Sequence, residues 1–348
     1  MKTLVLIDSN AVIHRAYHAL PKNLSNTRRE LTNVTYGFAL ALIKILEELK
    51  PDFVAAAFDL AGPTFRHVEY KEYKATRVKA DQELYDQIPR VREMLIAFGI
   101  PIYAVEGFEA DDIIGTIVDF CNGHNEKCKI PGEDLLVYIA SGDRDVYQLL
   151  NGHSKVFMLK HGFSEAEIFD TKHLKEVYNL EPTDFIDLKA LMGDASDNIP
   201  GIPGIGPKTA TDLLIKFDTL EKLYEKIAKL LNCSIANLTE QQFSNETIVT
   251  IAKQLGIKER ILKLLIEHKE QAFMSQRLAT IRRDVPIDFN LADARWGQYD
   301  KEKVRALFEE LEFRSLLRRF TKGWEGESAE KKVTEEQKKK DKQLKLEL

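Results

Sequence analysis

The chain has 348 residues, of which 44% are hydrophobic and 30% charged, and its formal net charge is −5. This length suits two or three domains with a sizeable core, and the acidic balance excludes a histone-like coat for nucleic acid. Three cysteines exclude a disulfide framework. No run reaches the roughly 18 apolar residues of a membrane span, and the first apolar run is too short for a signal peptide. We therefore expect a cytoplasmic protein with no membrane partner.

Apolar runs of strand length alternate with helical patterns in the first half of the chain. The strands are predicted at Thr3–Ile7, Phe53–Phe58 and Leu135–Ala140, and the helices at Asn33–Leu49 and Leu84–Phe98. This alternation is typical of an α/β domain, so we expect a mostly parallel central sheet flanked by helices over residues 1–180.

The pattern changes after residue 180, where short helices follow one another without strong strand signals. We expect a helical subdomain over residues 181–290 and a C-terminal segment over residues 291–322 that packs back on the core. Lysine, glutamate and glutamine dominate residues 323–348, which predicts a charged, disordered tail.

Acidic residues stand just past the ends of the three predicted strands. Because the carboxyl ends of parallel strands meet at one sheet edge, we expect these side chains to gather there. A second set opens a predicted helix, and a third lies in the run GDASDN. The nine acids are Asp8, Asp59, Glu109, Asp111, Asp112, Asp143, Asp145, Asp194 and Asp197.

Each of these acids alone has an ordinary structural explanation as a turn residue or a helix cap. Nine carboxylates at one edge would repel one another unless their pKa values rise or cations bind between them. Oxygen ligands without histidine or cysteine favour Mg²⁺, for which Mn²⁺ can substitute. Two or more such ions suit in-line displacement at a phosphodiester.

A glycine-rich run, Gly201–Ala210, predicts a tight hairpin between two helices, with Pro207 in the first turn of the second helix. The backbone N–H groups at that helix start suit a phosphate. We expect the phosphate contacts to come from Gly204, Gly206, Lys208 and Thr209. The alternative is a plain connector between helices.

The stretch Phe65–Lys79 interleaves cations with aromatic rings, which suits single-stranded nucleic acid. Its cations include Arg66, Lys74 and Arg77, and its rings include Tyr73. An ordinary solvated helix face is the alternative. Arg15, near the N-terminus, could contact nucleic acid in a similar way.

These motifs together resemble the 5′ nuclease domain at the N-terminus of bacterial DNA polymerase I, a family related to the flap endonucleases. The matching segments run in order from residue 4 to about 320 and include LIDSNAVIHRAYHAL, EGFEADDIIGT, ASGDRDVYQLL and GDASDNIPGIPGIGPKTA. Two positions depart from the family pattern. His14-Arg15 stands where Tyr-Arg is common, and Arg144 stands where Lys is common in GDKD.

The resemblance implies a structure-selective 5′–3′ exonuclease and flap endonuclease of replication and repair, with two or more Mg²⁺ ions on the nine carboxylates. It implies a helical arch over about residues 60–98, in which Arg66, Lys74 and Arg77 match positions that face the scissile phosphate or the strand. It also implies DNA contacts from Arg15 and Tyr73, and a helix-hairpin-helix motif that grips duplex DNA. In similar proteins a K⁺ ion binds hairpin carbonyls, which here lie near Ile202 and Ile205.

The implied partners are DNA with a 5′ flap, a 5′ end or a nicked or branched duplex, and a DNA polymerase and ligase that share the substrate. A monomer is the expectation. One alternative is a flap-binding scaffold with weak catalysis. Another, a dehalogenase-type phosphatase, wants an aspartate where Asn10 stands. Whether the chain is a stand-alone nuclease or part of a longer polymerase stays open.

Overall fold

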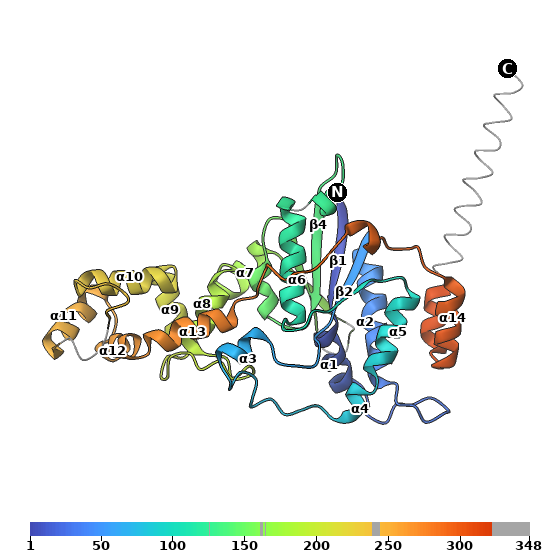
Figure 1. The fold of residues 1–348 in the computed structure, drawn as a ribbon, viewed down its shortest axis with the longest axis horizontal. Helices are drawn as coiled ribbons and strands as arrows, with labels where there is room; N and C mark the ends of the chain where they lie inside the picture. Colours follow the sequence, from blue (N-terminus) through green and yellow to red (C-terminus); the bar gives the residue numbers. More distant parts are fainter. Residues whose placement is uncertain (125, 161–162, 164, 239–243, 322–348) are drawn as a thin grey trace, which may run out of the picture.

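A computed structural model of the chain describes residues 1–321, apart from 125, 161–162, 164 and 239–243. The tail expected at 323–348 lies outside the described residues. Figure 1 shows a central sheet covered by helices, which we call the sheet domain, and a helical subdomain that extends from one side of it. No helix among the described residues is long and apolar enough to cross a membrane.

The sheet has six strands in the order β3-β2-β1-β4-β5-β6. All neighbours are parallel except β5 and β6, which are antiparallel. The strands are β1 (Lys2–Asp8), β2 (Phe53–Ala57), β3 (Ile102–Tyr103), β4 (Leu135–Ser141), β5 (Ser154–Leu159) and β6 (Ala166–Phe169). In this register Asp8 pairs with Ala57 and Ile7 with Ala140, so β1, β2 and β4 end at the same edge.

Alternate residues of the central strands enter two different cores. Val5 and Ile7 of β1 belong to one core, and Leu4 and Leu6 to the other, because successive side chains of a strand point to opposite faces. The first face is covered by α1 (Ser9–Ala19), α2 (Asn33–Leu49), α5 (Ile88–Ala97) and α14 (Lys301–Glu310), and the second by α6 (Ala110–Asp119). Both faces are therefore buried, which explains the continuous apolar runs of the strands.

The helical subdomain encloses a third apolar core. Its helices are α8 (Asp184–Met192), α9 (Pro207–Phe217), α10 (Leu220–Leu230), α11 (Asn245–Leu255), α12 (Glu259–Glu267) and α13 (Lys269–Ala279), and α7 (Thr171–Tyr178) precedes them. After α13 the chain returns to the sheet domain, where Ile281, Val285 and Phe289 enter the core beneath α6. A short turn of 3-10 helix at Leu291–Ala294 and then α14 follow.

The α/β class and the parallel sheet are confirmed, but the structure differs from the sequence prediction in three respects. The helix predicted at Leu84–Phe98 is two helices, α4 (Gln82–Tyr85) and α5, because Pro89 lies in the first turn of α5 and suits a helix start. The strands β3, β5 and β6 escaped prediction. The basic stretch contains only one short helix, α3 (Phe65–Glu69), and then continues in turns.

Candidate active site

Two neighbouring cavities open at the sheet edge where β1, β2 and β4 end. The cavity of about 560 Å³ is lined by seven of the nine predicted acids: Asp8, Asp59, Glu109, Asp111, Asp143, Asp145 and Asp197. The cavity of about 720 Å³ shares Asp143 and Asp145 with it and adds Asp194. Only Asp112 lines neither cavity. Eight of the nine predicted acids thus line these two cavities.

Local backbone structure fixes the acids at the strand ends. The Asp8 side chain caps α1 by accepting from the Ala11 N–H at 3.1 Å, and its other oxygen accepts from the Ser141 hydroxyl at 2.7 Å. The Asp59 carboxylate accepts from the Ala110 N–H at 2.6 Å, which joins the end of β2 to the start of α6. Asn10 accepts from the Asp59 N–H at 3.1 Å. Each bond holds one acid at the cavity wall.

Burial changes the charge state of several carboxylates. Burial raises the pKa of Asp8 to about 7, against hydrogen bonds from Ser141 and Ala11 that lower it. The pKa of Asp145 also rises to about 7, because of burial and then the neighbouring Asp143. Burial raises the pKa of Asp59, and it raises that of Asp111 well above its ordinary value. A cation in the cavity would reverse these shifts.

Asp111 offers a direct observation on whether this donor set fits a metal. Its Oδ1 atom is buried and has no hydrogen-bond partner among the described residues. A carboxylate oxygen in that state suits a hard cation such as Mg²⁺. Within the described part of the chain, no three acidic, histidine or cysteine side chains converge into a preformed site. The carboxylates thus line one cavity and have the chemistry to bind such an ion, but their side chains are not arranged around one position.

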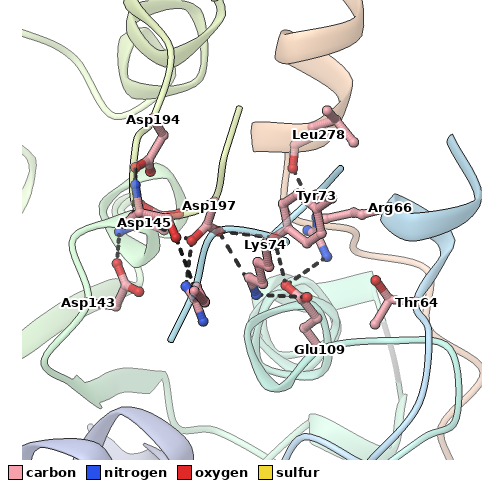
Figure 2. A network of polar contacts seen from close by, with 12 residues as sticks. Thr64, Arg66, Tyr73, Lys74, Glu109, Asp143, Asp145, Asp194, Asp197 and Leu278 are labelled. Carbon is pink, nitrogen blue, oxygen red and sulfur yellow. Dashed lines mark hydrogen bonds and ion pairs between the residues drawn. The ribbon is translucent and has the colours of Figure 1, made fainter. Parts of the chain in front are cut away.

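Side-chain cations bridge these carboxylates instead. Lys189 contacts Asp145 and lies 2.5 Å from Asp194. Burial opposes ionisation of Asp194, but Lys189 lowers its pKa to about 2. Lys74 lies 2.8 Å from Glu109, and Arg77 lies 2.5 Å from Asp197, as Figure 2 shows in part. Lys189 was not predicted, although its position five residues before Asp194 places it one helix turn from the GDASDN run.

The basic stretch is divided between the cavity and the protein interior. Lys74 and Arg77 line the smaller cavity, and Arg15 lines the larger one. Tyr73 is buried, and its hydroxyl donates to Glu109 at 3.1 Å and to Asp197 at 3.0 Å. Its ring is therefore not free for a base in this structure. Asp197 also accepts from Arg77 at 2.5 Å, so the stretch itself covers this end of the site.

Arg66 and Asp112 lie away from the cavities and bind each other. Arg66 is 1% exposed, and two of its nitrogens each donate to an Asp112 oxygen at 2.8 Å. Figure 2 shows Arg66 pointing toward the Leu278 carbonyl, to which it donates at 2.9 Å. The expected contact of Arg66 with a phosphate, and of Asp112 with a metal, would require both to leave this buried pair.

The glycine-rich run forms the expected hairpin between α8 and α9. Gly201 has φ +58°, and a Cβ atom there would lie 2.1 Å from the Gly193 nitrogen, so only glycine fits this turn. Gly204, Gly206 and Lys208 are exposed and Thr209 is half-buried. The side chains of Ile202 and Ile205 are buried in the third core. The hairpin thus presents its backbone outward while its isoleucines anchor it.

A second basic surface escaped the sequence analysis. A cavity of about 690 Å³ lies between α9 and the turn from α11 to α12, and Lys208, Lys216 and Lys258 line it. The Lys216 ammonium donates to the Gly256 carbonyl at 2.8 Å. The feature of the sequence that could have predicted this turn is Gly256, which ends α11 in a left-handed conformation.

Comparison with known proteins places both parts of the chain. The family model of the 5′–3′ exonuclease N-terminal resolvase-like domain matches residues 3–179, and that of the 5′–3′ exonuclease C-terminal SAM fold matches residues 180–302. The chain belongs to the 5′–3′ exonuclease family. The resemblance stated from the sequence is thereby confirmed.

Relatives of this exonuclease-family chain include DNA polymerase I of Bacillus subtilis and of Bacillus caldotenax, each 40% identical over 319 residues. The match covers 92% of this chain and 32% of each relative, so the chain spans about a third of their length.

Solved structures share the fold at lower identity. The T5 5′-exonuclease with bound zinc has a TM-score of 0.57 at 19% identity, over 89% of this chain and 98% of that one. The bacteriophage T5 flap endonuclease, in a complex with DNA and metal ions, has a TM-score of 0.58 at 18% identity, over 89% and 100%.

Proposed function

We propose that this protein is a structure-selective 5′–3′ exonuclease and flap endonuclease that hydrolyses DNA phosphodiesters with two or more Mg²⁺ ions. The observation that carries the proposal is the cavity lined by seven carboxylates at the carboxyl edge of the sheet. Family membership supports the same reaction class. A protein that only bound flaps would gain nothing from carboxylates beside DNA phosphates, since like charges repel.

The ions would be held by the acids that face the two cavities, with the orphaned Asp111 oxygen as one ligand atom. When bound, Mg²⁺ supplies an activated water and neutralises charge on the leaving oxygen. Mn²⁺ can substitute for it, because both prefer oxygen ligands. Ser141 and the Ala11 N–H orient the Asp8 carboxylate, and the Ala110 N–H orients that of Asp59.

The cations of the cavity would exchange partners when substrate and metal enter. Lys74 and Arg77, which now pair with Glu109 and Asp197, would contact the phosphate next to the cut, and Arg15 would contact the strand beside the larger cavity. Their charges then neutralise DNA instead of the protein's own acids. We propose Tyr73 as a DNA contact only after its hydroxyl releases Glu109.

The hairpin would grip duplex DNA through phosphates and leave the base sequence unread. Gly204, Gly206, Lys208 and Thr209 supply its backbone and side-chain donors, and carbonyls near Ile202 and Ile205 would hold a K⁺ ion. The bound DNA would carry a 5′ flap, a 5′ end or a nick. Because the relatives are DNA polymerases, we propose that a polymerase and a ligase share the substrate during replication and repair.

The deciding experiment is cleavage of a 5′-labelled flap duplex with Mg²⁺, with EDTA, and with a matched blunt duplex as a control. The expected result is metal-dependent cutting near the flap junction and little cutting of the blunt duplex. Tight binding without cutting under Mg²⁺ or Mn²⁺ would replace the nuclease with the flap-binding scaffold.

A further inference from the structure

The segment Leu278–Val285, which we call the joint, connects α13 to the sheet domain. Buried side chains of the sheet domain hold its backbone at almost every residue. Arg66 donates to the Leu278 and Thr280 carbonyls at 2.9 and 3.0 Å. The remaining bonds are Gln148 Nε2 to the Ala279 carbonyl (3.0 Å), Ile281 N–H to Gln148 Oε1 (2.8 Å), Arg282 N–H to Asp112 Oδ1 (2.8 Å) and Val285 N–H to Thr116 Oγ1 (3.1 Å).

These four side chains lie in the interior, where an unmade hydrogen bond is costly. Asp112 and Thr116 are 0% exposed and Gln148 is 4% exposed. The joint also touches α6 directly, because a Cβ atom at Gly115 would lie 2.7 Å from Ile281 and 2.9 Å from the Arg282 carbonyl. A network that is buried and fully paired holds one arrangement far better than an apolar contact does.

The same side chains connect the joint to the carboxylates. Asp112 Oδ2 accepts from the Glu109 N–H at 3.0 Å, and Arg66 lies 3.3 Å from the Glu109 carboxylate. Figure 2 shows Arg66 between Glu109 and the Leu278 carbonyl. Gln148 sits in the turn of 3-10 helix that begins at Asp145. A shift of the joint would therefore move Glu109 and Asp145.

At its other end, α13 holds the hairpin. Gln271 donates to the Gly201 carbonyl at 2.6 Å, and the Ser275 hydroxyl accepts from the Gly201 N–H at 3.1 Å. Side chains of α13 and backbone groups of the joint thus lie on one path from the hairpin to the cavity. Because α13 is a regular helix and the joint is hydrogen-bonded along its backbone, a displacement of the hairpin would be passed on to the cavity.

We propose that the joint sets the spacing between the hairpin and the carboxylate cavity, and thereby selects which phosphodiester is cut. Arg66, Asp112 and Gln148 are positioning residues in this arrangement, because their side chains hydrogen-bond the backbone of the joint. The inference rests on the proposed nuclease function. The inference assigns a role in choosing the cut position to residues whose side chains contact only other residues of this protein.

The first test is Gln148→Ala in the full chain, because among the described residues its side chain bonds only the joint. Cut positions on a flap substrate are mapped at single-nucleotide resolution with Mg²⁺. We expect the wild type to cut mainly at one phosphodiester, and the variant to spread its cuts over neighbouring ones with KM raised about tenfold, since a misplacement of about 1 Å is enough to impair a reaction. One unchanged cut position with unchanged KM in the folded variant would overturn the proposal.

Two variants at Thr116 provide a second test in case Gln148→Ala fails to fold. Thr116→Val removes the acceptor of the Val285 N–H and keeps the shape, whereas Thr116→Ser keeps the hydroxyl. We expect the valine variant to spread the cuts and the serine variant to cut like the wild type. If both retain the wild-type cut position while folding normally, the joint does not select it.

A measurement without catalysis separates this inference from the proposed function. Spin labels carried by non-natural amino acids at the exposed Ile96 of α5 and Ile215 of α9 report the distance between the two parts. The distance distribution should be narrow in the wild type and broad in the valine variant. If the distribution broadens in the valine variant but the wild type cuts no DNA, the joint sets the spacing and the proposed nuclease function is wrong. If the two widths are equal and the wild type cuts DNA, the nuclease stands and the proposal for the joint is overturned.

Discussion

Two groups of carboxylates and cations lie close together in this protein, and they differ in what surrounds them. Around Arg66 and Asp112, every side is protein and each oxygen has a donor. Around Lys74, Arg77 and Lys189, the carboxylates face open cavities, and one oxygen of Asp111 has no donor in the described part of the chain. The first group, which we call the closed group, suits a fixed structure. The second, which we call the open group, can exchange its cations. Substitutions in the two groups should therefore affect different properties.

The largest effect is expected in the open group, on activity. Asp143→Asn should lower cleavage about a thousandfold, because a metal ligand contributes several kcal/mol to stabilising the transition state. DNA binding measured in Ca²⁺ should stay equal or tighten, since one repulsive charge is lost. Single-turnover cleavage and equilibrium binding on the same flap measure both. Cutting at the wild-type rate would remove Asp143 from the metal site.

The largest effect on stability is expected in the closed group. Arg66→Met should lower the free energy of unfolding by about 3–5 kcal/mol, because it leaves Asp112 charged and buried without a cation. Urea unfolding measures this. Adding Asp112→Asn to the variant removes the stranded charge and should restore part of the loss. If the double variant is no more stable than the single one, the two side chains do not act as a pair.

The open group should make stability depend on pH when metal is absent. Burial raises the pKa of Asp8 to about 7, above its unfolded value, so between about pH 4 and 7 the folded state holds a proton that the unfolded chain has released. Stability in EDTA should therefore fall as the pH rises through this window, and Mg²⁺ should flatten the decline. Melting temperatures at several pH values, with and without Mg²⁺, test this. A decline that is equally steep in saturating Mg²⁺ would contradict it.

A matched substitution in the open group should cost much less than Arg66→Met. Lys189→Met removes the cation between Asp145 and Asp194, but these acids face a cavity of about 720 Å³ that water can enter. Although the three side chains are only 15–19% exposed, Asp145, whose pKa is already raised to about 7, can take up a proton when Lys189 is lost, so we expect a loss of only about 1–2 kcal/mol. Half-maximal thermal stabilisation should also need less Mg²⁺, because a competing cation is gone. A loss as large as that of Arg66→Met would erase the distinction between the groups.

The smallest effect is expected outside both groups, at the hairpin. Lys208→Ala should weaken binding equally for all DNA sequences and reduce the slope of log affinity against log salt by about one, because one phosphate contact is lost. Lys229→Ala, at an exposed position of α10, serves as the matched control. A loss that differs between DNA sequences would show that Lys208 reads bases.

The sequence predicts the strands of the two central cores well because they are buried on both faces, which leaves continuous apolar runs such as Phe53–Phe58. It does not predict β6, which lies at a sheet edge and buries only Phe169 of its four residues. In the site, the spacing of the acids identifies the cavity wall. The spacing cannot separate Asp111 from its neighbour Asp112, because the partner that buries Asp112 lies 46 residues away at Arg66. Long-range pairing of this kind has no local signal.

The path of the chain after α13 bears on how the protein is made. The core beneath α6 is completed by Ile281, Val285 and Phe289, and the opposite core by Val304 and Phe308 of α14. During synthesis these residues leave the ribosome after the whole helical subdomain, so the two cores of the sheet cannot be completed before then. The helical subdomain has a core of its own and can fold earlier. The sheet domain is therefore completed only after the helical subdomain has been synthesised.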